Sequence, residues 1–493
     1  MPALKRLLFS TIVFIIGPAI QLALSVGAKE AERFASVERF GAKCDSSGVS
    51  KDGTDDSAAF LAADVHAIGF AVNARCRIAT EMRLASPIVF GPSGRLVIDP
   101  GVTVTLASSR SPIAAKTQQI FGGGGSAVLS SAPYASVAWW GALADQAADR
   151  DPAPAVRAAF VQANNRTVDF VGRRLTFRSA LPVPYPAIDP TAIPIQNLSG
   201  VTIDLRSARL SMDDAHTYTG ILLLDRLSHP TLLGGNFVGN RAGLTPSQEN
   251  AALVLLNIVG GVFRDQTFSG DWDFLGAPFV GDWLVNTTIE RANILSAGIC
   301  FDFSFMQYVK ITFKAKGSGS APQVCFSSIY DTLLAGYNHT GIAFTETNHV
   351  QVTSFGESGF NTGWRISSGR GYIIDGDWSS NQGTAPNVKG IGGHVYYDFS
   401  SVGHPPGDIT VRGQYRNNGT TVHGYGILID PAAIENSDMI DGIAIEAAFS
   451  HNGTVVDATT VNHLSNVSLR KISPANRVGK TLLALPSLSI GRP

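Results

Sequence analysis

Charged residues are scarce in this chain of 493 residues: Asp, Glu, Lys and Arg together make up 16%, and the formal net charge is −1. Nucleic-acid binding needs a basic surplus to neutralise phosphates, so the sequence argues against a nucleic acid as partner. Long helical runs are also rare, whereas glycine occurs 51 times. Asn, Thr, Ser, Val and Ile alternate through the second half. This composition is typical of an all-β protein with many turns.

Cysteine is scarce too, with four residues in the chain. There is no Cys-x-x-Cys and no cluster of cysteine and histidine, so we expect no metal site, and nothing in the sequence indicates a cofactor. Four cysteines suit an oxidising compartment without making the chain a disulfide-dense scaffold.

Long apolar runs are absent except at the N-terminus, where Lys5 and Arg6 precede an apolar run that reaches Ile16. Small residues ending at Ala28 offer a cleavage site before a charged stretch, which predicts a signal peptide over residues 1–28. The alternative is a signal anchor, although a Gly-Pro pair interrupts the apolar run. We therefore expect a secreted or periplasmic protein with no stable membrane span after cleavage.

One phrase occurs twice, one hundred residues apart. Residues 40–60 are FGAKCDSSGVSKDGTDDSAAF, and residues 140–160 are WGALADQAADRDPAPAVRAAF. In the first copy, Thr54, Asp55 and Asp56 are good residues to begin a helix. The second copy keeps the Gly, Ala and Phe positions but loses the acidic turn. A motif that preserves packing residues and drops polar ones indicates a structural element, an end-cap used twice.

Short segments in which apolar and polar residues alternate fill the second half, for example VTIDL at 201–205 and VKITF at 309–313. Similar phrases recur at roughly 20–30 residues, and Gly341 and Gly363, each before an apolar residue, are 22 positions apart. Short strands with one such period stack best as a parallel β-helix. Residues 195–475 predict roughly 12 coils, a rod of about 55–60 Å.

The chain divides into five parts. Four consecutive glycines at 122–125 predict a loop or flexible joint within a connector. The parts are a signal peptide (1–28), an N-terminal module with the first phrase (34–110), the Gly-rich connector (111–135), the parallel β-helix (136–475) and a C-terminal tail (476–493).

Two cysteines of the long module stand in similar contexts. Cys300 and Cys325 each follow an aliphatic residue and precede Phe. We expect them in the same slot of adjacent coils, close enough for a disulfide or a simple stack. Asn417, Asn418 and Asn452 are expected to be turn residues or members of an asparagine ladder.

The first phrase resembles the start of right-handed parallel β-helix proteins of the pectate-lyase-like superfamily, in particular the pectate-lyase-3-like and glycoside-hydrolase-28-related group, which includes phage tailspikes. The resemblance implies an all-β right-handed parallel β-helix with short capping helices. It also implies carbohydrate-active enzymes on extended polysaccharides, and because tailspikes are trimers it leaves a homo-oligomer open. The matching residues are Phe40, Gly41, Ala42, Asp45, Asp52, Gly53, Thr54, Asp55, Asp56, Ala59 and Phe60.

The chain departs from that family at the catalytic residues. The polygalacturonase set of Asn-Thr-Asp, Asp-Asp, Gly-His-Gly and Arg-Ile-Lys is not present, although Asp213-Asp214 exists. The resemblance therefore carries the fold and not the mechanism.

Carboxylates beside aromatic residues are the candidates for hydrolysis, because a glycosidase needs two carboxylates and aromatic faces suit sugar rings. The competing interpretation is that these are turn-forming aspartates beside core tryptophans. The catalytic candidates are Asp271, Asp273, Asp302, Asp375, Asp377 and Glu346, and the substrate-binding candidates are Trp272, Trp364, Trp378, Tyr308, His339 and Arg365.

A lyase would instead need a base near the C5 proton of an acidic sugar and positive charge for its carboxylate. Lys310, His349 and Arg370 join Tyr308, His339 and Arg365 as candidates for these roles. The sequence thus predicts an exported protein that cleaves or modifies a polysaccharide, with hydrolase, lyase and C5-epimerase all open. The competing class is a non-catalytic glycan-binding or cell-surface structural protein.

Overall fold

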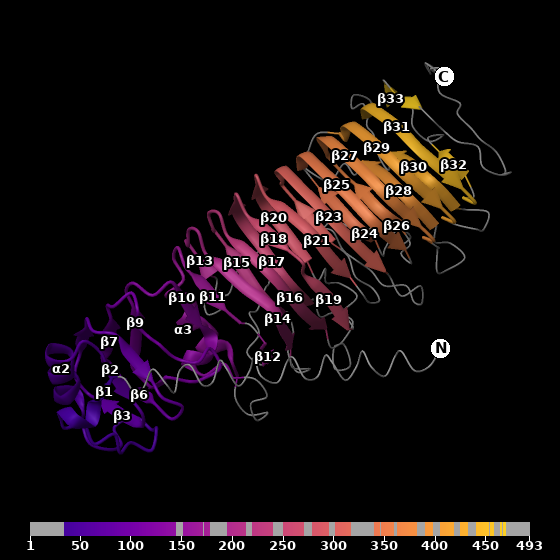
Figure 1. Cartoon of the computed structure of the whole chain (residues 1–493). Coiled ribbons are helices and arrows are strands. Elements are labelled where there is room, and N and C mark those ends of the chain that lie inside the picture. The colour runs from indigo at the N-terminus through magenta and orange to yellow at the C-terminus, as the bar shows by residue number, and fades with distance from the viewer. Residues whose placement is uncertain are drawn as a thin grey trace, which may run out of the picture. The chain divides into compact units, whose positions relative to one another are not determined.

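The computed structural model forms two compact units, residues 1–170 and 171–493, which are described separately (Figure 1). The predicted boundary between connector and long module, at 135/136, falls inside the first unit. The predicted signal segment lies outside the described residues. The structure describes residues 34–143, 151–170, 172–177, 195–212, 219–239, 250–270, 279–294, 301–316, 340–345, 347–358, 362–381, 390–397, 405–418, 424–431, 440–452, 454–457, 464–465 and 467–469.

The repeated phrase folds into a repeated structural element in the first unit. In the first copy, strand β1 (Ala35–Ser36) leads into a 3-10 helix (Val37–Phe40), then helix α2 (Ser57–His66) and β2 (Phe70–Val72), which pairs with β1. The second copy has the same order. It comprises β10 (Tyr134–Ser136), a 3-10 helix (Val137–Trp140), α3 (Ala153–Phe160) and β11 (Thr167–Asp169), with β10 paired to β11.

The residues shared by the two copies are the ones that set this geometry. Gly41 and Gly141 end the two 3-10 helices at φ 100° and 108°, a region that suits glycine. Phe60 packs on Phe70 with ring centroids 5.6 Å apart, and Phe160 packs on Phe170 at 6.0 Å. The structural interpretation of the phrase is confirmed.

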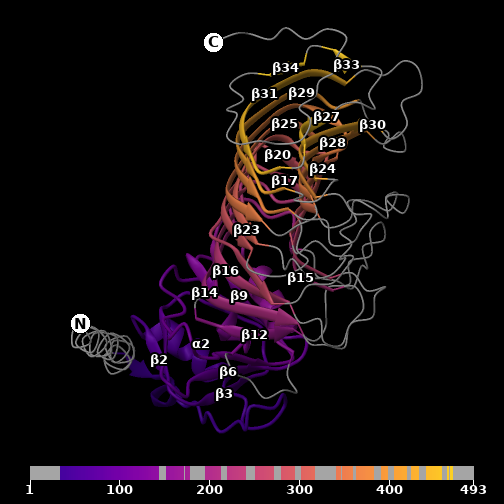
Figure 2. The ribbon, with the colours of Figure 1, turned by 90° about the vertical axis from the view of Figure 1, so that its right-hand side faces the viewer.

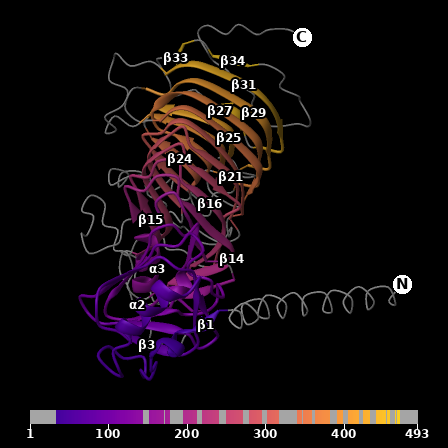
Figure 3. The ribbon, with the colours of Figure 1, turned by 60° about the vertical axis from the view of Figure 1, so that its left-hand side comes forward.

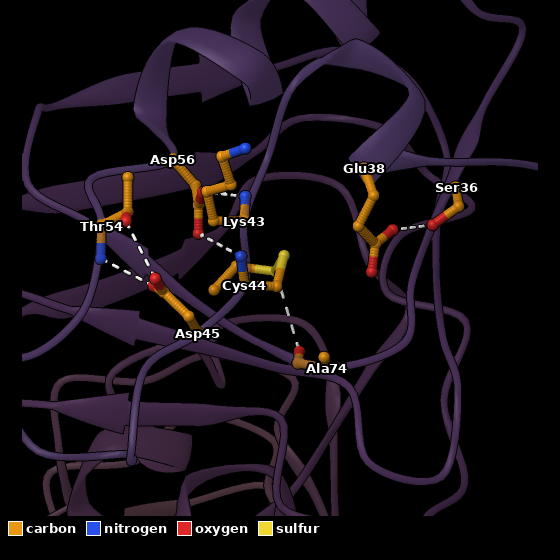
Figure 4. The surroundings of a disulfide bond; sticks show 9 residues. Ser36, Glu38, Lys43, Cys44, Asp45, Thr54, Asp56 and Ala74 are labelled. Atoms are coloured by element: carbon orange, nitrogen blue, oxygen red, sulfur yellow. Dashed lines mark hydrogen bonds between the residues drawn. A yellow bond between two sulfur atoms is a disulfide. The ribbon is translucent and has the colours of Figure 1, made fainter.

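The acidic residues of the first copy hold its loop together (Figure 4). Asp45 accepts hydrogen bonds from the amide and hydroxyl of Thr54 at 2.7 and 2.9 Å. Asp56 accepts from the amides of Lys43 and Cys44 at 2.6 and 3.1 Å, instead of capping its own helix. The cap of α2 comes from Asp55, which accepts from the Ser57 amide at 3.0 Å. Each of these carboxylates therefore has a structural task.

Three parallel sheets of three strands each complete the first unit. Their orders are β1-β2-β5, β3-β6-β8 and β4-β7-β9, so the chain visits the three sheets in turn and forms short coils. The remaining strands are β3 (Arg75–Ile78), β4 (Met82–Leu84), β5 (Ile88–Phe90), β6 (Arg95–Ile98), β7 (Thr103–Leu106), β8 (Phe121–Gly123) and β9 (Ser126–Leu129).

The prediction of a loop at the four glycines holds for Gly124 and Gly125, which connect β8 to β9, and is wrong for the other two. Gly122 and Gly123 belong to β8, where Gly123 pairs with Ile98. A Cβ atom on Gly123 would lie 2.1 Å from the carbonyl oxygen of Ile98, and one on Gly125 would lie 2.4 Å from that of Asp99. The glycines are needed because two backbones approach closely here, not because the segment is free.

The second unit consists of two ladders of parallel strands. In the first ladder each strand pairs in register with the next member. Its members are β13 (Ile195–Gln196), β15 (Thr219–Asp225), β17 (Asn250–Val259), β20 (Phe279–Val285), β22 (Phe301–Ser304), β24 (Thr340–Thr345), β26 (Thr362–Ile366), β28 (Gly390–Tyr397), β30 (Gly424–Pro431) and β32 (Thr454–Asp457).

The second ladder contains longer strands, several of which bend at a register shift. Figures 2 and 3 show its successive strands side by side. Its members are β12 (Arg174–Phe177), β14 (Thr202–Met212), β16 (Thr231–Gly239), β18 (Val262–Arg264) with β19 (Thr267–Gly270), β21 (Thr288–Ile294), β23 (Gln307–Lys316), β25 (Thr347–Ser358), β27 (Gly369–Ser379), β29 (Gly407–Arg416), β31 (Ile440–Ser450), β33 (Leu464–Ser465) and β34 (Ser468–Leu469).

The chain alternates between these ladders and so forms a right-handed parallel β-helix, as predicted. The predicted spacing of 22 residues is confirmed, since Ile342 pairs with Trp364. The prediction of roughly 12 coils is slightly too high: the described residues form ten, β13–β14, β15–β16, β17–β19, β20–β21, β22–β23, β24–β25, β26–β27, β28–β29, β30–β31 and β32–β34. Many coils are longer than 22 residues.

The core of this unit is a set of columns with one apolar side chain per coil. One column runs through the second ladder in unbroken register, and every member is fully buried. At about 25 cal/mol per Å² of apolar surface, this burial is the main stabilising term. The members are Ile203, Leu232, Phe263, Ile289, Ile311, Val352, Ile374, Val411 and Ile445.

An asparagine ladder closes one corner of the last coils. Asn418 accepts from the amide of Asn381 at 3.1 Å, and Asn452 accepts from the amide of Asn418 at 2.9 Å. The side-chain amides of Asn418 and Asn452 donate to the carbonyls of Trp378 and Tyr415. Asn417 adopts the left-handed turn conformation at φ 54°. These interactions confirm the predicted turn and ladder roles.

The structure does not test the expected proximity of Cys300 and Cys325. The described Phe301, which follows Cys300 in sequence, pairs with Ile342 of the next coil. Cys300 and Cys325 themselves lie outside the described residues.

Among the described residues, no helix has the length and apolar character needed to cross a bilayer.

A disulfide joins Cys44 to Cys76 and closes a loop of sequence separation 32 (Figure 4). Because a cross-link of this span removes entropy from the unfolded chain, we expect Cys44→Ser/Cys76→Ser to destabilise the first unit by about 3–4 kcal/mol. Amide hydrogen exchange of residues 40–78, followed by mass spectrometry, measures the change. Cys300→Ser is the control and should leave exchange in this segment unchanged. Equal protection in both variants would contradict the prediction.

The loop should also loosen in acid. Arg77 donates to Asp99 at 3.1 and 2.7 Å, and this interaction lowers the pKa of the Asp99 carboxyl. A lowered folded-state pKa means that the stabilisation is present above the unfolded value of about 4 and is lost as the pH falls through the folded-state value. We expect exchange of the Lys51 amide, which donates to Asp99, to accelerate below pH 4 relative to its intrinsic rate.

Asp99→Asn tests this assignment. It should flatten the pH dependence of exchange around Lys51, whereas Glu81→Gln, which removes an exposed carboxylate, should not. An unchanged pH profile in Asp99→Asn would show that another group controls the loop.

Candidate functional site

Several predicted site residues fall outside the part of the chain that the structure describes. Asp302 belongs to the described strand β22, opposite Val280 and Ala343. The predicted residues outside the described ranges are Asp271, Trp272, Asp273, His339 and Glu346.

The predicted tryptophan platforms are core residues. Trp364 and Trp378 are both 0% exposed, and the Trp364 indole N–H donates to the Tyr415 hydroxyl at 2.9 Å. Neither indole has a face available to a sugar, so their prediction as substrate-binding residues is corrected. Arg365, next to Trp364 in β26, is buried as well. In β27 the half-buried Asp377 directly precedes the buried Trp378.

The two described candidate carboxylates on β27 are each engaged. Asp375 accepts from the amide of Gly376 at 2.7 Å. Asp377 forms an ion pair with Arg416 at 2.5 Å. Gly376, at φ 121°, bends the strand between them, so they lie on different arms of the coil. The structure does not bring them together as a facing pair.

A groove of about 670 Å³ lies on the second ladder, where its first strands bend. Four neighbouring members of the ladder, β12, β14, β16 and β18–β19, contribute to it. The polar side chains that line it are Arg174, Arg206, Ser207, Arg209, Asn236, Asp265 and Thr267.

The floor of the groove results from a mismatch between adjacent coils. Leu205 pairs with Gly234 and Arg209 with Asn236, so three residues of β14 stand opposite the single residue Gly235. The extra residues project outward as a β-bulge. Gly234 and Gly235 have φ 68° and 108°, and side chains there would meet the backbone of Arg206 and the side chain of Leu205. The groove forms because β14 bulges outward next to two glycines that have no side chains to fill the space.

Arginine side chains give the groove its charge. Arg174 and Arg209 occupy the same register position on neighbouring strands, about 4.8 Å apart in the ladder direction. Within the described residues, neither arginine forms an ion pair with a carboxylate. Arg206 is held in a two-bond pair by Asp204 at 2.9 and 2.6 Å. The groove therefore contains two adjacent cations that this part of the structure leaves uncompensated.

The carboxylate in the groove is already bound. Asp265 accepts from the Nε and terminal nitrogen of Arg291 at 2.6 and 2.8 Å. This bidentate contact lowers the pKa of Asp265 and raises the pKa of Arg291. Asp265 is consequently an ionised structural partner at neutral pH, and it is poorly suited to act as a general acid.

The row that carries the arginines continues up the ladder. Arg209 pairs with Asn236, and Asn236 pairs with Thr267. The Asn236 side-chain oxygen accepts from Ser269 at 3.0 Å, which orients its amide. The groove thus presents two cations followed by an amide and a hydroxyl, one side chain per coil.

This row was not among the sites predicted from the sequence, although a signal exists. Arg174 begins the tetrapeptide RLTF and Arg209 begins RLSM, and these are the segments that lie in register. These two segments are 35 residues apart in sequence, whereas Ile342 and Trp364 are 22 apart. A search for repeats of one fixed length therefore does not align them.

Aromatic rings lie on a different corner of the second unit. Tyr308, a predicted binding residue, is 54% exposed and stacks on His349 with centroids 4.8 Å apart. Trp283, which follows Gly281 and Asp282 in sequence, is 53% exposed and stacks on Phe305 at 4.7 Å. These side chains are exposed, together with Phe355 on β25, whereas Trp364 and Trp378 are buried.

Among the described residues, one group of possible metal ligands comes together, Cys44, Asp56 and Cys76. The two sulfur atoms are bonded to each other and Asp56 accepts two backbone amides, so these residues do not suit a metal ion.

No protein-family model matches the chain, and no curated protein matches it in sequence. Among solved structures it is similar to the mannuronan C-5 epimerase AlgE4 A-module of Azotobacter vinelandii, at 12% identity over 87% of this chain and 99% of that one, with a TM-score of 0.28. It is also similar to the tailspike protein of Acinetobacter baumannii phage AM24, at 11% identity over 90% and 55% of the chains, with a TM-score of 0.25.

An exopolygalacturonase from Thermotoga maritima is similar at 11% identity over 90% and 96% of the chains, with a TM-score of 0.26. The two in-register ladders of the chain itself define its architecture. The chain is a right-handed parallel β-helix protein.

Proposed function

We propose that this chain is an exported protein that binds an acidic polysaccharide along the arginine groove. The observation that carries the proposal is the register of Arg174 over Arg209, with no carboxylate partner for either among the described residues. Two like charges on adjacent strands repel each other, and a ligand with a carboxylate or sulfate removes that repulsion. Arginine also binds such groups through two parallel hydrogen bonds.

The shape of the groove favours a chain over a single small anion. The row from Arg174 to Thr267 spans four strands, about 14 Å along the ladder. One polar side chain per coil matches an extended polymer whose sugar units follow one another at similar intervals. The arginines would bind acidic groups, while Asn236 and Thr267 would bind hydroxyls.

The described lining supports binding more strongly than hydrolysis. Its carboxylate, Asp265, is occupied by Arg291, and the described lining includes no His, Tyr or Lys. This observation favours the glycan-binding alternative over a glycosidase with two free carboxylates. Asp271 and Asp273 directly follow β19, the strand that supplies Thr267, and remain our proposed catalytic candidates.

The test measures affinity for polygalacturonate, alginate and hyaluronan, with dextran as a neutral comparison. We expect Arg174→Gln and Arg209→Gln each to weaken binding of the preferred acidic polymer about tenfold, because each removes a charge-assisted contact. The dependence of affinity on salt should also become shallower. Arg412→Gln removes an exposed arginine paired with Glu446 in a distant coil and is the control.

Equal affinity of the two groove variants and the wild type would contradict the proposal. The same incubations are assayed for unsaturated products and for reducing ends. If either forms, its loss in Asp271→Asn or Asp273→Asn identifies the catalytic carboxylate, and its persistence in both rejects them.

A further inference from the structure

Each described coil from β13 to β23 passes from the first ladder to the second through two left-handed positions three residues apart. Glycine suits this conformation because it lacks the Cβ atom that would approach the following carbonyl oxygen, and asparagine tolerates it because its short polar side chain forms local hydrogen bonds. The corner pairs, in coil order, are Asn197 and Gly200, Arg226 and His229, Asn257 and Gly260, Trp283 and Asn286, and Phe305 and Tyr308.

In the middle coils, aromatic residues occupy these left-handed corner positions. Trp283, Phe305, Tyr308 and His349 have φ values of 56°, 50°, 55° and 55°. Bulky residues are uncommon in this region, and such strain tends to gather at functional sites. The fold does not require them, since Asn257 serves at the position one coil before Trp283 and Asn286 at the position one coil before Tyr308.

The rings form two stacked pairs that run from coil to coil. Trp283 and Phe305 are nearly parallel at 7°, and Tyr308 and His349 are inclined at 25°. On the side of Trp283 away from Phe305, the side chain of Asn257 turns to Asp225, to which it donates at 2.9 Å. Each stack therefore covers one ring face, while Trp283 and Tyr308 remain more than half exposed.

Exposed amide side chains stand next to the rings in sequence. Asn286, Gln307 and Asn348 are exposed beside them on the same corner, and Gln351 is exposed on β25. A flat apolar surface bordered by groups that both donate and accept hydrogen bonds matches a pyranose ring, which has apolar C–H faces and a rim of hydroxyls.

We propose that Trp283 and Tyr308 form a second carbohydrate site, which binds the apolar ring faces of a neutral polysaccharide. We call it the corner site. It belongs to the coils β20–β25, whereas the arginine groove belongs to β12–β19 and the bend of the second ladder. The two sites bind through different interactions. Ion pairing in the arginine groove weakens with ionic strength, whereas ring stacking at the corner does not depend on it in this way. The corner site therefore does not rest on the proposed function of the groove.

The test uses Trp283→Asn/Tyr308→Asn, because asparagine is what neighbouring coils carry at these positions. The variant removes the rings while it relieves the left-handed conformation, so folding is expected to be retained. Phe355→Asn is the matched control, since Phe355 is 64% exposed on β25 but belongs to neither stacked pair. Affinity electrophoresis in gels containing mixed-linkage β-glucan, xyloglucan, galactomannan or dextran measures binding.

We expect at least one of these neutral polymers to retard the wild type, and the double variant to bind it about tenfold more weakly. Added salt, Phe355→Asn and Arg174→Gln/Arg209→Gln should leave this retardation unchanged. Indole fluorescence should respond to the polymer in the wild type, and the variant should lose this response, because Trp283 is 53% exposed and is the tryptophan that the variant removes.

Two results would overturn the proposal. One is the absence of retardation by every neutral polymer, and the other is equal retardation of the double variant and the wild type. If light scattering also shows a changed oligomeric state in a double variant with unchanged retardation, the corner is a contact between copies of the chain. Loss of acidic-polymer binding in the arginine variants is a separate readout, so failure of one site does not decide the other.

Discussion

Everything described for the second unit depends on one constraint, the in-register stacking of each parallel coil on the one before it. A column such as Ile203, Leu232 and Phe263 stays dry only if each coil places its apolar residue directly beside the last. A slip of one residue would turn every inward side chain outward. The same register aligns the outward side chains into rows. The alignment of outward side chains into rows therefore follows from the register that packs the core.

This constraint explains how single residues become sites. One arginine per coil is unremarkable on a surface, but Arg174 directly beside Arg209 concentrates positive charge in a groove. One left-handed aromatic residue would be a local cost of about 1–2 kcal/mol. Stacked pairs such as Trp283 and Phe305 recover part of it, by about 0.5–1.5 kcal/mol. The arginine groove would bind its ligand by charge at a bend of the second ladder, and the corner site would bind by stacking on ring faces.

The sequence allowed the architecture to be predicted because the relevant signals are local. Alternation within a strand, the spacing that pairs Ile342 with Trp364, and the repeated Gly and Phe of the phrase each involve few residues. The burial of Trp378 could not be predicted this way, because Gly376 bends the strand before it and the inward position is known only once the coils are aligned.

The groove was harder to foresee for the same reason. Its residues come from four strands whose spacing in sequence varies with the length of the coils, so no fixed period brings Arg174 and Arg209 together. The glycines at 122–125 were predicted to form a loop or flexible joint. Sequence alone does not distinguish this from a close approach of two backbones, because both require glycine. In both cases the missing information was the register between segments distant in sequence.

Cysteine cross-linking tests the register at the groove directly. Paired positions on adjacent strands fall within the Cα separation that a disulfide allows, whereas positions two residues apart on the same face do not. In Arg174→Cys/Arg209→Cys, mild oxidation should join the two positions, as shown by peptide mapping, and Arg174→Cys/Ser211→Cys should remain largely unlinked. Preferential linkage of 174 to 211 would contradict the register on which the account depends.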